Sequence, residues 1–180
     1  MSDLFEHLRN EVLLCDGAMG SRLQQADLNV EIDYRGQENC SEILNLSRPD
    51  IVREIQQGFI AAGADIILTN TFGGSPITLA EFDLSDQAHE INQRAAELGR
   101  ESVESFHRDG ISRYVLGDIG PGTKLPSLGQ ISYDELEALC ARLEAESGRN
   151  LVMQQDLIHA KGQVDGELMR FKAIQAYIAK

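Results

Sequence analysis

The sequence lacks a long apolar run and an excess of basic charge. No stretch of its 180 residues offers the roughly 20 consecutive apolar residues that a membrane-spanning helix needs. The 16 Lys and Arg residues are outnumbered by 29 Asp and Glu residues, which gives a formal net charge of −13. This charge repels the phosphate backbone of nucleic acids and anionic lipid headgroups. We therefore expect no nucleic-acid or membrane partner, and a neutral or small polar ligand.

The sequence also has few cysteines and no export signal. Cys15, Cys40 and Cys140 form no closely spaced pair, whereas zinc ribbons and disulfide scaffolds contain such pairs. We interpret the three as small apolar residues of a reduced, intracellular protein. Asp3 and Glu6 stand where a secretory signal would carry basic and then apolar residues. The sequence thus predicts a cytoplasmic protein.

Short apolar runs alternate along the chain with longer amphipathic segments. Residues 12–15, 65–69 and 114–116 predict three strands, and residues 151–153 predict a weaker fourth strand. The run 65–69 is continuous, as is typical of a parallel strand that is covered on both faces. A loop that contains glycine follows each of the first three strands.

Helices are predicted over residues 47–63, 85–110 and 132–148, where apolar residues recur at helical spacing. Ser132 and Glu135 form a capping box at the start of the third helix. The alternation of strand, glycine-containing loop and helix indicates an α/β fold with parallel βα units. An open doubly wound sheet and a (β/α)₈ barrel both fit. A complete barrel typically takes about 250 residues, so we expect four strands that cannot close a barrel unaided.

Polar residues gather where the first three predicted strands end. Asp16 follows the first, Thr69, Asn70 and Thr71 follow the second, and Asp118 follows the third. In parallel α/β folds, ligands bind at the carboxyl ends of the strands. Each of these residue types is also an ordinary turn or cap former. Together they predict a small-molecule site as one interpretation and purely structural turns as the other.

Four segments form an ordered set of motifs: residues 14–21 (LCDGAMGS), 43–50 (ILNLSRPD), 61–72 (AAGADIILTNTF) and 117–121 (GDIGP). Together they resemble the homocysteine S-methyltransferase family. The likeness is strongest to the homocysteine-binding domain of cobalamin-dependent methionine synthases, with betaine-homocysteine methyltransferases as more distant relatives. It implies a (β/α)₈ barrel of the TIM type and the transfer of a methyl group to the thiol of homocysteine, which forms methionine.

The resemblance also implies a pocket shared by the three strand ends. The expected substrate-binding residues are Asp16, Gly17, Met19, Thr69, Asn70, Thr71, Gly117 and Asp118. Asp16 would pair with the ammonium group of homocysteine, because an acidic contact at the first strand end is a feature of the family. The carboxylate of homocysteine would meet backbone N–H groups and threonine hydroxyls.

In this family a zinc ion, held by three cysteines on later strands, binds the sulfur of homocysteine and displaces its proton. The family's Gly-Gly-Cys-Cys type of segment is absent from this sequence, and residues 154–156 (QQD) follow the fourth predicted strand in place of the family's Glu-Thr pair. We therefore expect no catalytic residue and no zinc ligand in this chain. The histidines, which we interpret as surface residues of helices, are His7, His89, His107 and His159.

The resemblance leaves the methyl donor open among methylcobalamin, methyltetrahydrofolate, a betaine and S-methylmethionine, and any cobalamin or folate module would lie outside this chain. We expect residues 1–153 to form the first half of a barrel and residues 154–180 to form a C-terminal helical tail. The uncovered edges of a half-barrel favour self-association or pairing with the missing half. Two functions remain open: an incomplete homocysteine S-methyltransferase, and a non-catalytic remnant or amino-acid-binding α/β module without the zinc site.

Overall fold

The computed structural model describes residues 4–106, 110–120, 122–124, 126–135, 137–138 and 141. The chain divides into two compact units, residues 1–124 and 125–180. Within the described part of the chain, no helix has the length and apolar character needed to cross a membrane. The predicted fourth strand and the predicted tail over residues 154–180 lie outside the described residues, so both, with the domain boundary between them, stay predictions.

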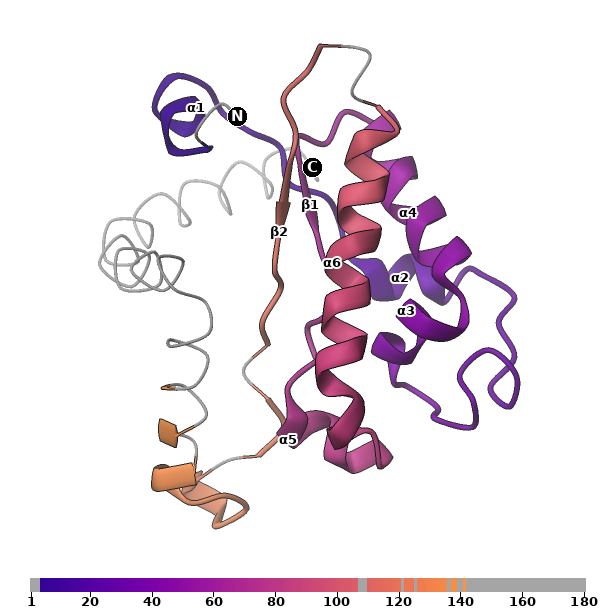
Figure 1. Cartoon of the computed structure of the whole chain (residues 1–180), viewed down its shortest axis with the longest axis vertical. Helices are drawn as coiled ribbons and strands as arrows, with labels where there is room; N and C mark the ends of the chain where they lie inside the picture. Colours follow the sequence, from indigo (N-terminus) through magenta and orange to yellow (C-terminus); the bar gives the residue numbers. More distant parts are fainter. Residues whose placement is uncertain are drawn as a thin grey trace, which may run out of the picture. The chain divides into compact units, whose positions relative to one another are not determined.

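A small parallel sheet runs through the first unit (Figure 1). Strand β1 (Ile66–Leu68) pairs in parallel with strand β2 (Tyr114–Leu116). On the opposite edge of β1, Cys15 forms a parallel bridge with Ile66. The predicted strands over 65–69 and 114–116 are confirmed at their centres. The chain therefore has an α/β fold with a parallel sheet, as the alternating pattern predicted.

The segment before Asp16 runs beside β1 without forming the regular strand predicted over residues 12–15. The carboxylate of Asp65 accepts a hydrogen bond from the Leu14 N–H at 2.9 Å, where a strand would use its backbone. The Leu14 carbonyl accepts hydrogen bonds from the N–H groups of Asp65 and Ile66, at 2.8 and 3.0 Å. The prediction of a full strand is wrong, but the segment still delivers Asp16 to the carboxyl end of β1.

Two long helices cover the strands from one side (Figure 1). Helix α4 (Pro49–Ala61) buries Val52, Ile55 and Ile60, and helix α6 (Ala88–Glu104) buries Ile91, Ala95 and Leu98. The buried apolar positions are spaced three and five residues apart in α4 and four and three residues apart in α6, so each helix presents one apolar stripe to the core. The apolar stripe predicted for the second helix is confirmed.

The boundaries of the helices differ from the predicted ones. Ser47 does not cap α4, because it ends the preceding short helix and its hydroxyl donates to the carbonyl of Asp33. Arg48 is the N-cap of α4. Gly63 follows α4 with φ of 108°, as expected for a glycine that ends a helix. Helix α6 begins after a 3₁₀ turn and ends at Glu104, short of the predicted end at residue 110.

A buried polar link joins both long helices to the end of β1. The Ser102 hydroxyl of α6 donates to Gln56 Oε1 of α4 at 2.9 Å. Gln56 Nε2 donates to the Leu68 carbonyl at 3.2 Å, and both side chains are 0% exposed. Buried polar groups need such partners, so the link fixes the helices relative to the strand end at which the candidate site begins.

Short helices complete the described structure: α1 (Leu4–Asn10), α2 (Met19–Leu23), η1 (Ser41–Ile43), α3 (Leu44–Ser47), α5 (Pro76–Leu79), η2 (Ala80–Phe82), η3 (Ser85–Gln87) and, in the second unit, η5 (Pro126–Leu128). In the second unit, Ser132 and Glu135 form the predicted capping box. Ser132 Oγ accepts from the Glu135 N–H at 3.1 Å, and the Glu135 carboxylate accepts from the Ser132 N–H at 2.9 Å.

Candidate functional site

A cavity of about 600 Å³ lies where the strands of the first unit end. Of the eight predicted site residues, those that line it are Asp16, Gly17, Met19, Thr69, Asn70, Thr71 and Asp118. Gly117 does not line the cavity and is exposed. The structure thus brings together the residues that follow the Cys15 bridge, β1 and β2, which we call the first, second and third strand ends, as expected for parallel βα units.

The cavity also has lining residues that the sequence reasoning missed. They are Ala18, Gly20, Asn39, Ser41, Glu42, Leu68, Gly73, Thr78, Glu81, Phe82 and Thr123, whereas Phe72, the last residue of the 61–72 motif, lines the cavity as the resemblance implies. Three of them, Asn39, Ser41 and Glu42, follow a long loop and come from no strand end. Nothing in the local sequence marks this segment, because only the path of the loop brings it to the cavity.

Asp16 combines a structural contact with a place in the cavity wall. Its Oδ2 accepts a hydrogen bond from the Leu68 N–H at 3.0 Å, and its Oδ1 lies 3.6 Å from the thiol of Cys15. Burial raises the pKa of the Asp16 carboxyl, and the charge of Asp118 raises it further, while the hydrogen bond from Leu68 acts in the opposite direction. The ionised carboxylate is therefore under-compensated, which favours a cationic group beside it.

Asp118 is a second half-buried carboxylate of the cavity. Burial raises the pKa of its carboxyl, and a hydrogen bond from the Ile119 backbone opposes this shift. Because the Asp118 charge also raises the pKa of Asp16, the two carboxylates repel each other when both are ionised. A positively charged ligand group between them would reduce this repulsion.

Hydroxyl groups join the second and third strand ends. Thr69 Oγ1 lies 2.6 Å from Thr71 Oγ1. Thr71 Oγ1 donates to the Asp118 carbonyl at 2.7 Å, and the Asp118 N–H donates to Thr69 Oγ1 at 3.1 Å. The two threonines thus contact each other and both backbone groups of Asp118.

The Asn70 side chain forms hydrogen bonds with other residues of the chain. Its Nδ2 donates to the Ser41 carbonyl at 2.8 Å and to Asn45 Oδ1 at 3.1 Å, while Asn45 Nδ2 donates to the Asn70 carbonyl at 2.8 Å. Both asparagines are almost fully buried. Asn70 therefore holds the segment that begins at Ser41 against the second strand end.

Glu42 is a buried carboxylate that sequence reasoning missed. It is 6% exposed, and its Oε1 accepts a hydrogen bond from the Gly73 N–H at 2.7 Å. A Cβ atom at Gly73 would lie 2.9 Å from the same oxygen, so only glycine fits there without a shift. Gly120 is similarly constrained, because its N–H donates to the Phe72 carbonyl at 2.9 Å and an added Cβ would lie 2.5 Å from that oxygen.

The described residues do not fit the zinc ion that the resemblance implies. Within the described ranges, no group of three or more His, Cys, Asp or Glu side chains is placed to hold a metal ion. Burial raises the pKa of the Cys40 thiol to about 11, whereas a metal ligand must be the thiolate. Cys15 is exposed, and Cys140 lies outside the described residues.

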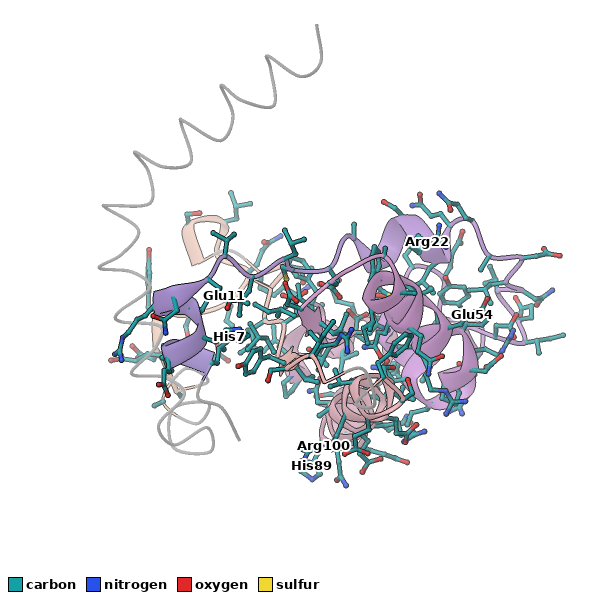
Figure 2. The ribbon with its side chains drawn as sticks, turned by 90° about the horizontal axis from the view of Figure 1, so that it is seen from above. His7, Glu11, Arg22, Glu54, His89 and Arg100 are labelled. Atoms are coloured by element: carbon teal, nitrogen blue, oxygen red, sulfur yellow. The ribbon has the colours of Figure 1, made fainter. Side chains whose placement is uncertain are left out.

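The two described histidines lie on helices, as predicted (Figure 2). His89 is exposed on α6. His7 lies on α1 but is half-buried, unlike the predicted surface position, because its Nε2 is 3.4 Å from the carboxylate of Glu11 and its Nδ1 is 3.1 Å from the Tyr114 hydroxyl. Neither lines the cavity. The positions of His107 and His159 lie outside the described residues.

The sequence matches known methyltransferases over most of its length. The family model for homocysteine S-methyltransferase matches residues 13–159. The chain is 39% identical over 171 residues to the methionine synthases of Mycobacterium tuberculosis and Mycobacterium leprae. Each alignment covers 92% of this chain and 14% of the relative, so the chain spans about one seventh of the length of these relatives.

The fold matches solved structures of a homocysteine methyltransferase, MmuM from Escherichia coli. The metallated form gives a TM-score of 0.53 over 63% of this chain and 40% of that protein. The oxidized form gives a TM-score of 0.55 over 65% of this chain and 40% of that protein. Sequence identity is 24% in both cases, so this likeness concerns the fold.

Proposed function

We propose that this chain, which belongs to the homocysteine S-methyltransferase family, binds homocysteine in the cavity at the ends of its parallel strands. One observation carries the proposal: polar residues from three separate strand ends line a single cavity. The parallel topology alone brings these ends together, but it does not require two half-buried carboxylates, Asp16 and Asp118, to line the same cavity. A site for a small polar molecule accounts for the convergence.

In this proposal, Asp16 receives the ammonium group of homocysteine. Burial and the charge of Asp118 make an isolated Asp16 carboxylate costly, and an ammonium group would offset this cost with a charge-assisted hydrogen bond. Gly17 and Met19 would lie beside the ligand at the same strand end, and Asp118 would face it from the third strand end.

The reaction that we propose for the complete enzyme is methyl transfer to the thiol of homocysteine. In this reaction, the present chain would bind the amino acid. A free thiol has a pKa of about 8.5 and is mostly protonated at neutral pH. Within the described residues, no group of three or more His, Cys, Asp or Glu side chains is placed to hold a metal ion that could displace this proton. The methyl donor stays open.

We also propose that the described strands are the opening βα units of a (β/α)₈ barrel. The parallel pairing of β1 with β2, the helices on one side of the strands and the likeness to the fold of MmuM support this arrangement. In such a barrel the free edges of the sheet would pair with further strands. Self-association and pairing with a complementary half are therefore both expected, and sedimentation measurements would distinguish them from a stable monomer.

Calorimetric titration of the chain with homocysteine, alongside homoserine and alanine, tests the proposal. We expect homocysteine to bind more tightly than either control. Equal binding of all three would favour a generic amino-acid module, and no binding of any would contradict the proposed site. A parallel methyl-transfer assay separates the two open functions: binding without turnover, with each candidate donor supplied, would favour the non-catalytic binding module.

A further inference from the structure

The hydrogen bonds among Thr69, Thr71 and Asp118 have a direction that the heavy atoms determine. A backbone N–H can only donate, so Thr69 Oγ1 is the acceptor in its 3.1 Å contact with the Asp118 nitrogen. A carbonyl can only accept, so Thr71 is the donor in its 2.7 Å contact with the Asp118 oxygen. Each threonine hydroxyl has one hydrogen.

The third contact follows from the first two. Thr71 has already used its hydrogen on Asp118, so in the 2.6 Å contact between the hydroxyls Thr69 must donate to Thr71. The three bonds form a closed ring that runs from the Asp118 N–H through Thr69 and Thr71 to the Asp118 carbonyl. Both hydroxyl hydrogens are spent inside this ring. Toward the cavity, the hydroxyls therefore offer lone pairs, which accept hydrogen bonds and do not bind a carboxylate.

The ring fixes the backbone of the loop that follows β2. Thr69 is 6% exposed and directly follows β1, so its hydroxyl is fixed by the strand. Asp118 follows β2, and the ring holds both of its backbone polar groups. The Gly120 N–H, bound to the Phe72 carbonyl, attaches the same loop at a second point. The Asp118 carboxylate is thereby held in the cavity wall.

We propose that Thr69 and Thr71 are positioning residues, which hold Asp118 in the cavity through this ring, and that they do not bind the carboxylate of the ligand. The proposal rests on the proposed function where it concerns homocysteine, and it stands on the ring geometry where it concerns Asp118. It replaces the expectation that threonine hydroxyls receive the ligand carboxylate. That group is left to backbone N–H donors.

Amide hydrogen exchange of the ligand-free chain tests the ring. The Asp118 amide is measured relative to the Ile66 amide, whose N–H is bonded to the Leu14 carbonyl. Loss of one hydrogen bond changes an equilibrium by about threefold to tenfold, so Thr71→Val should speed the relative exchange of Asp118 by that factor, although Thr71 does not touch this N–H. Thr71→Ser keeps the hydroxyl and should restore the wild-type rate. An unchanged rate in Thr71→Val, or equal rates in both variants, would overturn the ring.

Thr78→Val is the matched control for this experiment. Thr78 is a buried threonine of the same cavity, and its hydroxyl lies 2.9 Å from Ser75 Oγ, outside the ring. Thr78→Val removes a threonine hydroxyl, as Thr71→Val does, and should leave the relative exchange of Asp118 unchanged. Faster exchange of Asp118 in this variant would show a general loosening of the loops and would count against a specific ring.

A pair of ligands separates positioning from direct contact. Aminopropanethiol is homocysteine without its carboxylate. If Thr71 acts only by positioning, Thr71→Val should weaken the binding of both molecules by the same factor, about threefold to tenfold. If its hydroxyl binds the carboxylate, only homocysteine binding should weaken, and the proposal would be wrong. If the wild-type chain bound neither molecule, the proposed function would fail, while the exchange experiment would still decide the ring.

Discussion

The carboxylate of Asp16 accepts a hydrogen bond from the Leu68 N–H at 3.0 Å, across 52 positions of the sequence. The residue that we expect to contact the ligand therefore also closes the carboxyl end of β1. These two roles make different demands on the side chain. The Leu68 N–H needs an oxygen acceptor, which asparagine also has, whereas an ammonium ligand needs the negative charge.

Asp16→Asn should accordingly weaken homocysteine binding by roughly 1.5 to 3 kcal/mol, the range for a hydrogen bond to a charged group, with little loss of stability at neutral pH. Asp16→Ala should also leave the Leu68 N–H without its acceptor and lower the free energy of unfolding by about 1 to 3 kcal/mol. Calorimetric titration and denaturant unfolding of both variants check this. If Asp16→Asn lost stability and kept its affinity, Asp16 would be a turn former only.

The stability of the chain should depend on the ionisation of Asp16 in a defined direction. Burial raises the pKa of Asp16 in the folded chain from its ordinary value of 3.8. The folded state therefore retains the proton to a higher pH than the unfolded state, and this group lowers stability as the pH rises from about 4 through the folded pKa. Asparagine does not titrate.

The unfolding free energy of Asp16→Asn, minus that of the wild-type chain, should therefore increase as the pH rises from about 4 to 7. Denaturant unfolding at several pH values measures this difference, and taking the difference cancels the titration of carboxylates that do not interact with Asp16. A difference that decreased with pH would show that the Asp16 carboxylate is stabilised by folding, contrary to the burial that we describe.

Two glycines of the loop that follows β2 should differ in their tolerance of alanine. At Gly120 a Cβ would lie 2.5 Å from the Phe72 carbonyl oxygen, so Gly120→Ala must displace the loop and should cost about 1 to 3 kcal/mol of stability. At Gly117 nothing lies within 4 Å of an added Cβ, and Gly117→Ala should change stability by less than about 0.5 kcal/mol. Thermal and denaturant unfolding compare the two, and equal effects would refute the close approach at Gly120.

The buried link between α4, α6 and β1 should be sensitive to the loss of one hydroxyl. Ser102→Ala leaves Gln56 Oε1, which is fully buried, without its donor, and should cost about 1 to 3 kcal/mol. Ser105→Ala serves as the control, because Ser105 is exposed and water can replace its bonds to Gln57 Nε2 at 3.1 Å and to the Ser102 carbonyl at 2.6 Å. A smaller loss in Ser102→Ala than in Ser105→Ala would contradict the structural role of the link.

Much of the first unit was predictable because its signals are local. The runs around Ile67 and Val115 are short and apolar, and the stripe of α6 repeats at helical spacing, so each marks its own element. Parallel strands put their carboxyl ends on one edge, so the residues after each strand could be placed together. Gly117 was the exception: it directly follows β2 but is exposed outside the cavity.

The rest depended on tertiary contacts that leave no local signal. The Asp65 carboxylate accepts the hydrogen bond of the Leu14 N–H, so the segment predicted as a strand forms only a single bridge, at Cys15. Glu42 reaches the cavity only through the path of a long loop. It lies just before the 43–50 motif, and nothing in the local sequence marks this acidic side chain as buried. The direction of the threonine hydrogen bonds follows from Asp118, whose backbone position no sequence pattern specifies.

The most direct test of the proposed homocysteine site is to map homocysteine binding on the isotope-labelled chain by nuclear magnetic resonance. If the cavity is the homocysteine site, titration should shift the backbone amide signals of residues at the three strand ends, Asp16 to Met19, Thr69 to Gly73 and Asp118, and leave the exposed outer face of α6 unchanged. Saturable shifts confined to these three segments would support homocysteine binding in the cavity. Shifts that lie elsewhere, or none at saturating homocysteine, would contradict it.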